Sequence, residues 1–115
     1  MIQMDRKTKA LFEAKARILK ALSHPTRLFI IEELSRGERC VHELTRMIGD
    51  DTSTVSKHLS VLKNKGIIQN ERRGYYNFYN LKIPCILRFE ECINHILKAN
   101  ARKHLKLVLK KPKKI

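Results

Sequence analysis

Residues 38–66 read "ERCVHELTRMIGDDTSTVSKHLSVLKNKG", and this stretch decides the fold. Apolar residues recur at helical spacing on both sides of "GDDT" (49–52), which predicts two short helices with a very short connection. Asp51 or Thr52 can cap the second helix, and Gly66 can end it. The stretch therefore predicts a helix-turn-helix.

The second of these helices has two distinct faces at ~100° per residue. Its apolar face comprises Val55, Leu59 and Leu62. Its polar face comprises Ser53, Ser56, Lys57 and Ser60. Short hydroxyls and one long cation let the helix approach base edges and phosphates in a major groove, although any solvated helix face could look the same. His58 lies at the border between the faces, where a packing or orienting hydrogen bond within the motif is favoured over a base contact.

A β-hairpin follows, in "IIQNERRGYYNFYNL" (67–81), where Ile, Tyr and Phe cluster around the turn signal Arg73-Gly74. It is the only strand signal that we find in the sequence. Its basic tip, Arg72 and Arg73, is flanked by Tyr75 and Tyr76. Such a wing can lie along the DNA backbone or place an arginine in the minor groove. A helix-turn-helix with a basic wing is far more specific than either part alone.

Helices are predicted on both sides of this unit. The first, over about residues 5–21, and the last, from Pro84, carry apolar stripes at helical spacing. The first stripe comprises Leu11, Ala14, Ile18 and Leu22, and the last comprises Ile86, Phe89, Ile93 and Leu97. The helix in "SHPTRLFIIEELSRGE" (23–38) should bury Leu28, Ile31 and Leu34, and the next helix should bury Val41, Leu44 and Ile48. We expect a domain over 1–99 and a basic tail over 100–115, its end "LKKPKKI" mobile and solvated.

The composition limits the class of protein. A chain of 115 residues has room for one domain, and its net charge of +14 calls for a polyanionic partner, nucleic acid first and an anionic membrane surface second. No apolar run approaches the ~20 residues that cross a bilayer, and the start lacks the apolar stretch of a signal peptide, so we expect a cytoplasmic protein. No Gly-rich phosphate loop or Ser/His/Asp arrangement stands out, so we expect no enzyme.

The order of four segments resembles the ArsR/SmtB family of winged-helix repressors over roughly residues 10–97. The segments are "LSHPTRLFIIEEL" (22–34), "ERCVHEL" (38–44), "TSTVSKHLSVLKNKGII" (52–68) and "RRGYYNFYNL" (72–81). The resemblance implies a mainly α winged helix-turn-helix with five helices and a small hairpin between the fourth and fifth. It further implies a homodimeric transcriptional repressor that dimerises through its first and last helices and leaves its operator when an inducer, often a metal ion, binds.

The family's functional positions map onto residues of this chain. The recognition role falls on Thr52, Ser53, Thr54, Ser56, Lys57 and His58, and the wing role on Arg72, Arg73 and Tyr75. A dimer would present its two recognition helices to half-sites roughly 34 Å apart on double-stranded DNA. The operator should therefore be an imperfect palindrome.

A sensor site is suggested by Cys40 and His42. Many family members open this helix with a Cys-Val-Cys box, and here His42 replaces the second cysteine. Thiolate and imidazole still suit a soft metal or metalloid ion as inducer. However, residues two apart in a regular helix point about 200° apart and cannot share an ion unless the first turn unwinds. Residues 1–23 offer no Cys or His as a further ligand.

The last helix offers Cys85, Cys92 and His95 as alternative ligands or redox groups, with Lys98 where the family's zinc site would have His or Glu. Seven residues of helix separate the two thiols by about 10.5 Å, too far for a disulfide within one helix. A bond across two antiparallel helices of a dimer, or from Cys92 to Cys40, could make a thiol-redox or sulfur-species switch. Free cysteines also commonly serve only in packing.

Two other functions stay open for the whole protein: a non-specific basic nucleic-acid-binding protein, and a winged helix that binds proteins rather than DNA.

Overall fold

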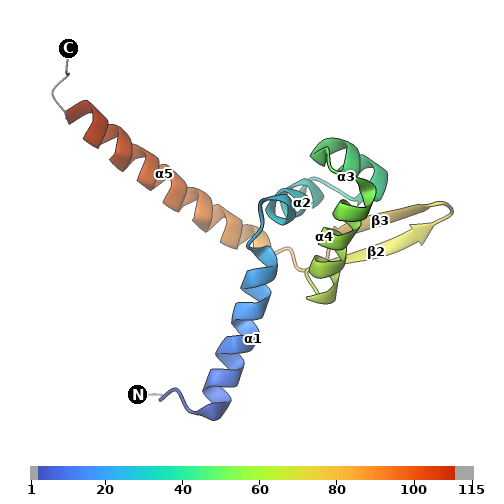
Figure 1. Cartoon of the computed structure of the whole chain (residues 1–115), viewed down its shortest axis with the longest axis horizontal. Coiled ribbons are helices and arrows are strands. Elements are labelled where there is room, and N and C mark those ends of the chain that lie inside the picture. The colour runs from blue at the N-terminus through green and yellow to red at the C-terminus, as the bar shows by residue number, and fades with distance from the viewer. Residues whose placement is uncertain (1–2, 111–115) are drawn as a thin grey trace. The chain divides into compact units, whose positions relative to one another are not determined.

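The computed structural model describes residues 3–110 and the side chains of residues 3–107. In chain order its elements are α1 (Arg6–Leu22), α2 (Pro25–Ser35), β1 (Arg39–Cys40), α3 (Val41–Ile48), α4 (Thr52–Asn64), β2 (Ile68–Arg73), β3 (Tyr76–Leu81) and α5 (Ile86–Lys110) (Figure 1). The predicted winged helix-turn-helix, mainly helical with a β-hairpin wing, is confirmed. The chain divides into two compact units, Met1–Pro84 and Cys85–Ile115, which are described separately here.

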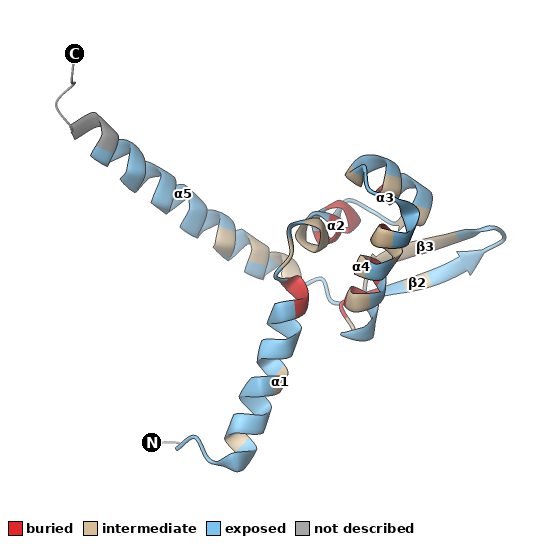
Figure 2. Cartoon of the chain, in the orientation of Figure 1, coloured by how far each residue is buried: buried red, intermediate tan, exposed pale blue. Residues whose placement is uncertain are grey.

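The core of the first unit lies where α2, α3, α4 and the start of β2 pack together. Figure 2 shows buried positions at the end of α1 and along α2. The largest side chains with almost no exposed surface are Ile30, Ile31, Leu44, Leu59, Leu62, Ile68 and Val55. The predicted inner face of α4 is therefore confirmed. In α2, Ile31 and Leu34 are buried as predicted, but Leu28 is only half-buried and Ile30 is buried in its place. The α2 sequence is apolar on several sides, so spacing alone could not orient it.

The turn between α3 and α4 depends on one glycine and one cap. Gly49 has φ 86, a left-handed conformation that residues with a Cβ rarely adopt, and its N–H donates to the Thr45 carbonyl over 2.9 Å. Asp51 then caps α4, because its Oδ1 accepts the Thr54 N–H at 2.7 Å. Of the two caps proposed from the sequence, Asp51 is thus the one used.

The hairpin belongs to a three-stranded antiparallel sheet in the order β1-β3-β2. Its turn contains Gly74 at φ 63, and Arg73 pairs with Tyr76 across it. The sequence missed β1, whose Arg39 and Cys40 pair with Tyr79 and Phe78. Two residues are too few to show an alternating pattern, so this strand exists only because β3 is there to pair with it.

The helix α1 buries little more than its last turn in the described chain. Ala21 and Leu22 are buried, whereas Leu11 and Phe12 are 54% and 51% exposed. The helix therefore leaves most of an apolar surface without a partner inside its own unit.

The helix α5 forms the second unit and is longer than expected. It continues to Lys110, into the range 100–115 for which the sequence predicts a basic tail, and residues 111–115 lie outside the described part. Several of its large apolar side chains are exposed, namely Phe89, Ile96, Leu97, Leu105 and Leu107. Among the described residues no helix is long and apolar enough to span a bilayer.

Candidate nucleic-acid interface

The predicted recognition residues lie on one helix, α4, as a polar face. Thr52, Ser53 and Lys57 are exposed, and Thr54 and Ser56 are half-buried. On the other side, Val55, Leu59 and Leu62 anchor the helix in the core. The Thr54 N–H and the Lys57 charge lower the pKa of Asp51, so this cap is ionised at neutral pH. The polar face is therefore presented on a helix that is fixed at its start and along its back.

His58 is held by a contact that the sequence could not reveal. Arg27 Nε donates to His58 Nδ1 over 3.2 Å, and the His24 ring centroid lies 4.4 Å from that of His58. Burial, then the nearby His24 and Arg27, lower the pKa of His58. A neutral imidazole is required here, because Nδ1 must accept the arginine's hydrogen bond. This contact orients the side chain within the protein, and its role in DNA contact stays a prediction.

Arg27 and His24 also tie three helices together. Arg27 Nη1 donates to the carbonyl of Ala21 over 3.1 Å, at the end of α1. His24 Nδ1 accepts the Thr26 N–H over 3.1 Å and so caps α2. The ends of α1, α2 and the back of α4 therefore meet at one arginine.

The two wing arginines differ in their contacts, although the family resemblance implies the same role for both. Arg72 and Tyr75 are exposed, Tyr75 to 94%. Arg73 instead donates to Glu38 at 2.6 Å and to Glu71 at 3.4 Å, and its guanidinium carbon lies 4.5 Å from the Phe78 ring centroid. The Arg73 guanidinium also holds the pKa of Glu38 below its usual value. Arg73 thus braces the wing against the residue that precedes β1.

Cys40 and His42 do not form a complete metal site within one protomer. Cys40 is buried, pairs with Phe78 in the sheet, and its N–H donates to Glu43 Oε1 over 3.0 Å. His42 is exposed, and its ring meets the Tyr76 ring edge-on at 6.1 Å. In residues 3–110 no group of three or more His, Cys, Asp or Glu side chains could hold a metal ion. Two donors are fewer than the three or four protein ligands of ordinary zinc sites.

Of the alternative thiols, Cys92 lies on α5, whereas Cys85 lies in the turn just before this helix. Cys85 and Cys92 are free and exposed, and His95 is exposed on the same helix. Nothing buries these thiols inside the second unit, so they are open to reagents or to another chain.

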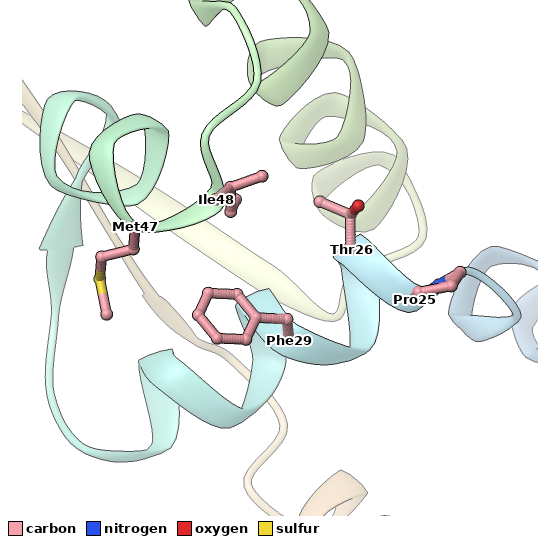
Figure 3. Close-up of a pocket in the computed structure, with 5 residues that line it drawn as sticks. All are labelled: Pro25, Thr26, Phe29, Met47 and Ile48. Atoms are coloured by element: carbon pink, nitrogen blue, oxygen red, sulfur yellow. The ribbon is translucent and has the colours of Figure 1, made fainter.

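A hollow of about 240 Å³ lies between α2 and α3, next to the helix-turn-helix. Figure 3 shows the Phe29 ring pointing from α2 toward the α3 side chains. Its lining residues are Pro25, Thr26, Phe29, Met47 and Ile48. The lining is mostly apolar and has no Cys, His or carboxylate, so it adds no ligand to the sensor residues.

Comparison with known proteins identifies the family of this fold. The family model for bacterial regulatory proteins of the arsR family matches residues 24–70. The crystal structure of the transcriptional repressor BigR from Xylella fastidiosa is 33% identical, with a TM-score of 0.67, and the match covers 84% of this chain and 96% of BigR. The chain belongs to the ArsR family. This is a family of transcriptional regulators and not of enzymes, as the sequence predicted.

Two further ArsR-type proteins are similar to the chain. The transcriptional repressor SmtB of Mycobacterium tuberculosis is 37% identical over 71 residues, 62% of this chain and 53% of SmtB, so the match spans about half of SmtB. A possible ArsR-family regulator from Mycobacterium bovis has a homodimeric winged helix-turn-helix DNA-binding domain. Its structure matches with a TM-score of 0.72 at 28% identity, covering 85% of this chain and 91% of that domain.

Proposed function

We propose that this ArsR-family protein is a transcriptional repressor that binds a palindromic double-stranded DNA operator as a homodimer. The observation that carries the proposal is the polar face of α4. Thr52, Ser53 and Lys57 are exposed on a helix whose opposite face is fully buried. Short hydroxyls and a cation on a rigid helix suit contacts with base edges and phosphates.

The homodimer is supported by apolar surface that the described chain leaves uncovered. On α1 the exposed large apolar residues are Leu11, Phe12, Ile18 and Leu19. Together with the exposed apolar residues of α5, they expose more apolar surface to water than the single, scattered apolar residues of an ordinary monomer surface. Covering both helices with a second copy removes that surface from water and yields the two-fold symmetry that a palindrome matches.

Competition binding tests the repressor. A duplex selected from a random-sequence library should be bound at least ~10³-fold more tightly than random DNA of the same length. Equal affinity for both duplexes at the same salt would instead identify a non-specific basic DNA-binding protein.

A charge reversal tests the surface. Replacing Ser56 and Lys57 together with Glu should abolish operator binding, because carboxylates facing phosphates repel them. The variant should keep the wild-type far-UV circular dichroism, since neither side chain lies in the core. Unchanged operator binding would mean that the chain reads DNA elsewhere, or binds a protein instead.

The finer part of the proposal is an inducer, with a soft metal or metalloid ion at Cys40 and His42 as the first candidate. The location supports it, because Cys40 pairs with Phe78 and the His42 ring meets Tyr76, both on the wing strand β3. Binding of an ion to these two residues would therefore act directly on the wing strand. In the described residues one protomer supplies only two donors, so further ligands would have to come from outside this pair.

The second inducer candidate is thiol oxidation, favoured by the exposure of Cys92 on α5 and of Cys85 just before it. Titrating the reduced protein on its operator with cadmium, arsenite and a mild oxidant separates the two. Loss of response only in Cys40→Ser would support the metal site, and loss only in Cys92→Ser would support oxidation. If no agent releases the DNA, both candidates fail while the repressor proposal stands.

A further inference from the structure

A basic groove lies between α1 and the end of α4, apart from the face that we assign to DNA. The hollow measures about 350 Å³, within the roughly 300–1,000 Å³ of small-ligand pockets. Its lining residues are Arg17, Lys20, Ala21, Arg27, Val61 and Lys65. All of them belong to the first unit, where α1, α2 and α4 meet (Figure 1). Four cationic side chains, from α1, from α2 and from the residue that follows α4, thus surround the apolar side chains of Ala21 and Val61.

Within residues 3–84, the four cations of this groove have no carboxylate partner. The salt bridges in this part of the chain have Arg36 and Arg73 as their cations. No acid lines the groove either. Like charges brought together repel one another, and an anion placed among them would relieve that repulsion.

The ends of the two helices do not account for this charge. The C-termini of α1, at Leu22, and α4, at Asn64, lie beside the groove and attract cations. Each helix end carries roughly half a negative charge, so two ends offset about one of the four positive charges. A net charge of about three is left for a ligand.

Arg27 is already fixed in a geometry that can receive an anion. It donates from Nε to His58 and from Nη1 to the Ala21 carbonyl, at 3.2 and 3.1 Å. A guanidinium has five N–H groups, so three donors remain beyond these two bonds. A held guanidinium suits two-point contact with phosphate oxygens, while flexible lysines add charge.

We propose that this basic groove binds a small free polyanion of the phosphate class, such as a metabolite or nucleotide that carries a pyrophosphate group. Arg27 would contact its oxygens directly, and Arg17, Lys20 and Lys65 would neutralise its charge. Arg27 also donates a hydrogen bond to His58 on α4. Ligand binding at Arg27 would therefore act on the helix that reads DNA, a consequence that rests on the proposed function.

Calorimetric titration of the full-length protein with pyrophosphate, without DNA and at constant ionic strength, tests the site. The wild type should bind one pyrophosphate per chain in a saturable manner. Replacing both Lys20 and Lys65 with Gln should weaken that binding at least ~10-fold. Replacing Lys9 of α1 and Lys63 of α4 with Gln removes the same charge outside the groove and should weaken pyrophosphate binding less than about twofold. All four lysines are exposed, so both variants should melt like the wild type.

Three results would overturn the proposal. Absence of saturable binding would show that the groove is not a site. Equal losses in the two double variants would show attraction to net charge alone. In a separate fluorescence anisotropy titration with DNA, a lower affinity of the groove variant than of the control variant would assign the groove to a phosphate of the DNA backbone rather than to a free polyanion. Since the titration contains no DNA, its outcome is independent of whether the repressor proposal holds.

Discussion

The helix α4 and the wing differ in the surroundings of their cations. On α4, Lys57 is exposed and enters no salt bridge of the described residues. On the wing, Arg73 is bound by two carboxylates and a phenyl ring, and Arg72 beside it is exposed. Adjacent basic residues in a sequence can therefore have different tasks. We infer that α4 specifies the operator while the wing contributes a general backbone contact through Arg72.

The largest expected effect is at Lys57, on the polar face of α4. Lys57→Glu should weaken operator binding about 100-fold, because it replaces attraction to DNA by repulsion. Lys63→Glu is the matched control, with the same charge change in the last turn of the same helix, and should cost much less. If both variants lost the same operator affinity in a fluorescence anisotropy titration, the polar face of α4 would not be its DNA-binding face.

The wing cation should have a smaller and sequence-independent effect. Arg72→Ala should weaken operator and random DNA alike by about tenfold and reduce the slope of log affinity against log salt by about 1. Arg73→Ala should leave that slope nearly unchanged, because this guanidinium is already engaged by Glu38 and Glu71. A larger change of slope for Arg73→Ala would show that it leaves its partners to bind DNA.

Removing the brace should free Arg73 for DNA. Glu38→Gln eliminates the carboxylate that lies 2.6 Å from Arg73 and removes a negative charge from the wing. Affinity for random DNA should rise about threefold at low salt. Glu13→Gln on α1 makes the same charge change away from the wing, and a rise of equal size there would point to net charge instead.

The smallest effect concerns His58 and pH. Burial, then the nearby His24 and Arg27, lower the pKa of His58 in the folded state, so the unfolded chain takes up its proton first as pH falls below about 6.5. Stability is thus lost from near that pH downward and levels off below the folded pKa. Thermal melts from pH 7 to pH 5 should show a smaller loss for His58→Gln than for the wild type. Identical losses would mean that His58 titrates as in an unfolded chain.

The parts of the fold that sequence predicted are those with a local signal. The spacing of Val55, Leu59 and Leu62 fixed the inner face of α4, and the Arg73-Gly74 turn fixed the hairpin. The parts that it missed depend on distant partners. Arg27 and His58 are 31 residues apart, and Glu38 and Arg73 are 35 apart.

The basic groove was missed for the same reason. Arg17, Arg27 and Lys65 come from α1, α2 and the end of α4, and each alone resembles an ordinary surface cation. In a chain with 25 Lys and Arg, composition could not indicate which of them share a hollow. These residues come together only because α1, α2 and α4 pack against one another.

The central claim is that α4 reads the operator and the wing only positions the protein. It is tested most directly by the ratio of operator to random-DNA affinity, measured by competition at one salt concentration for the wild type, for Ser56→Ala with Lys57→Ala, and for Arg72→Ala. The account predicts that the ratio collapses by at least ~10-fold in the α4 variant and is unchanged in the wing variant, since base contacts specify and phosphate contacts position. An unchanged ratio in the α4 variant would contradict it.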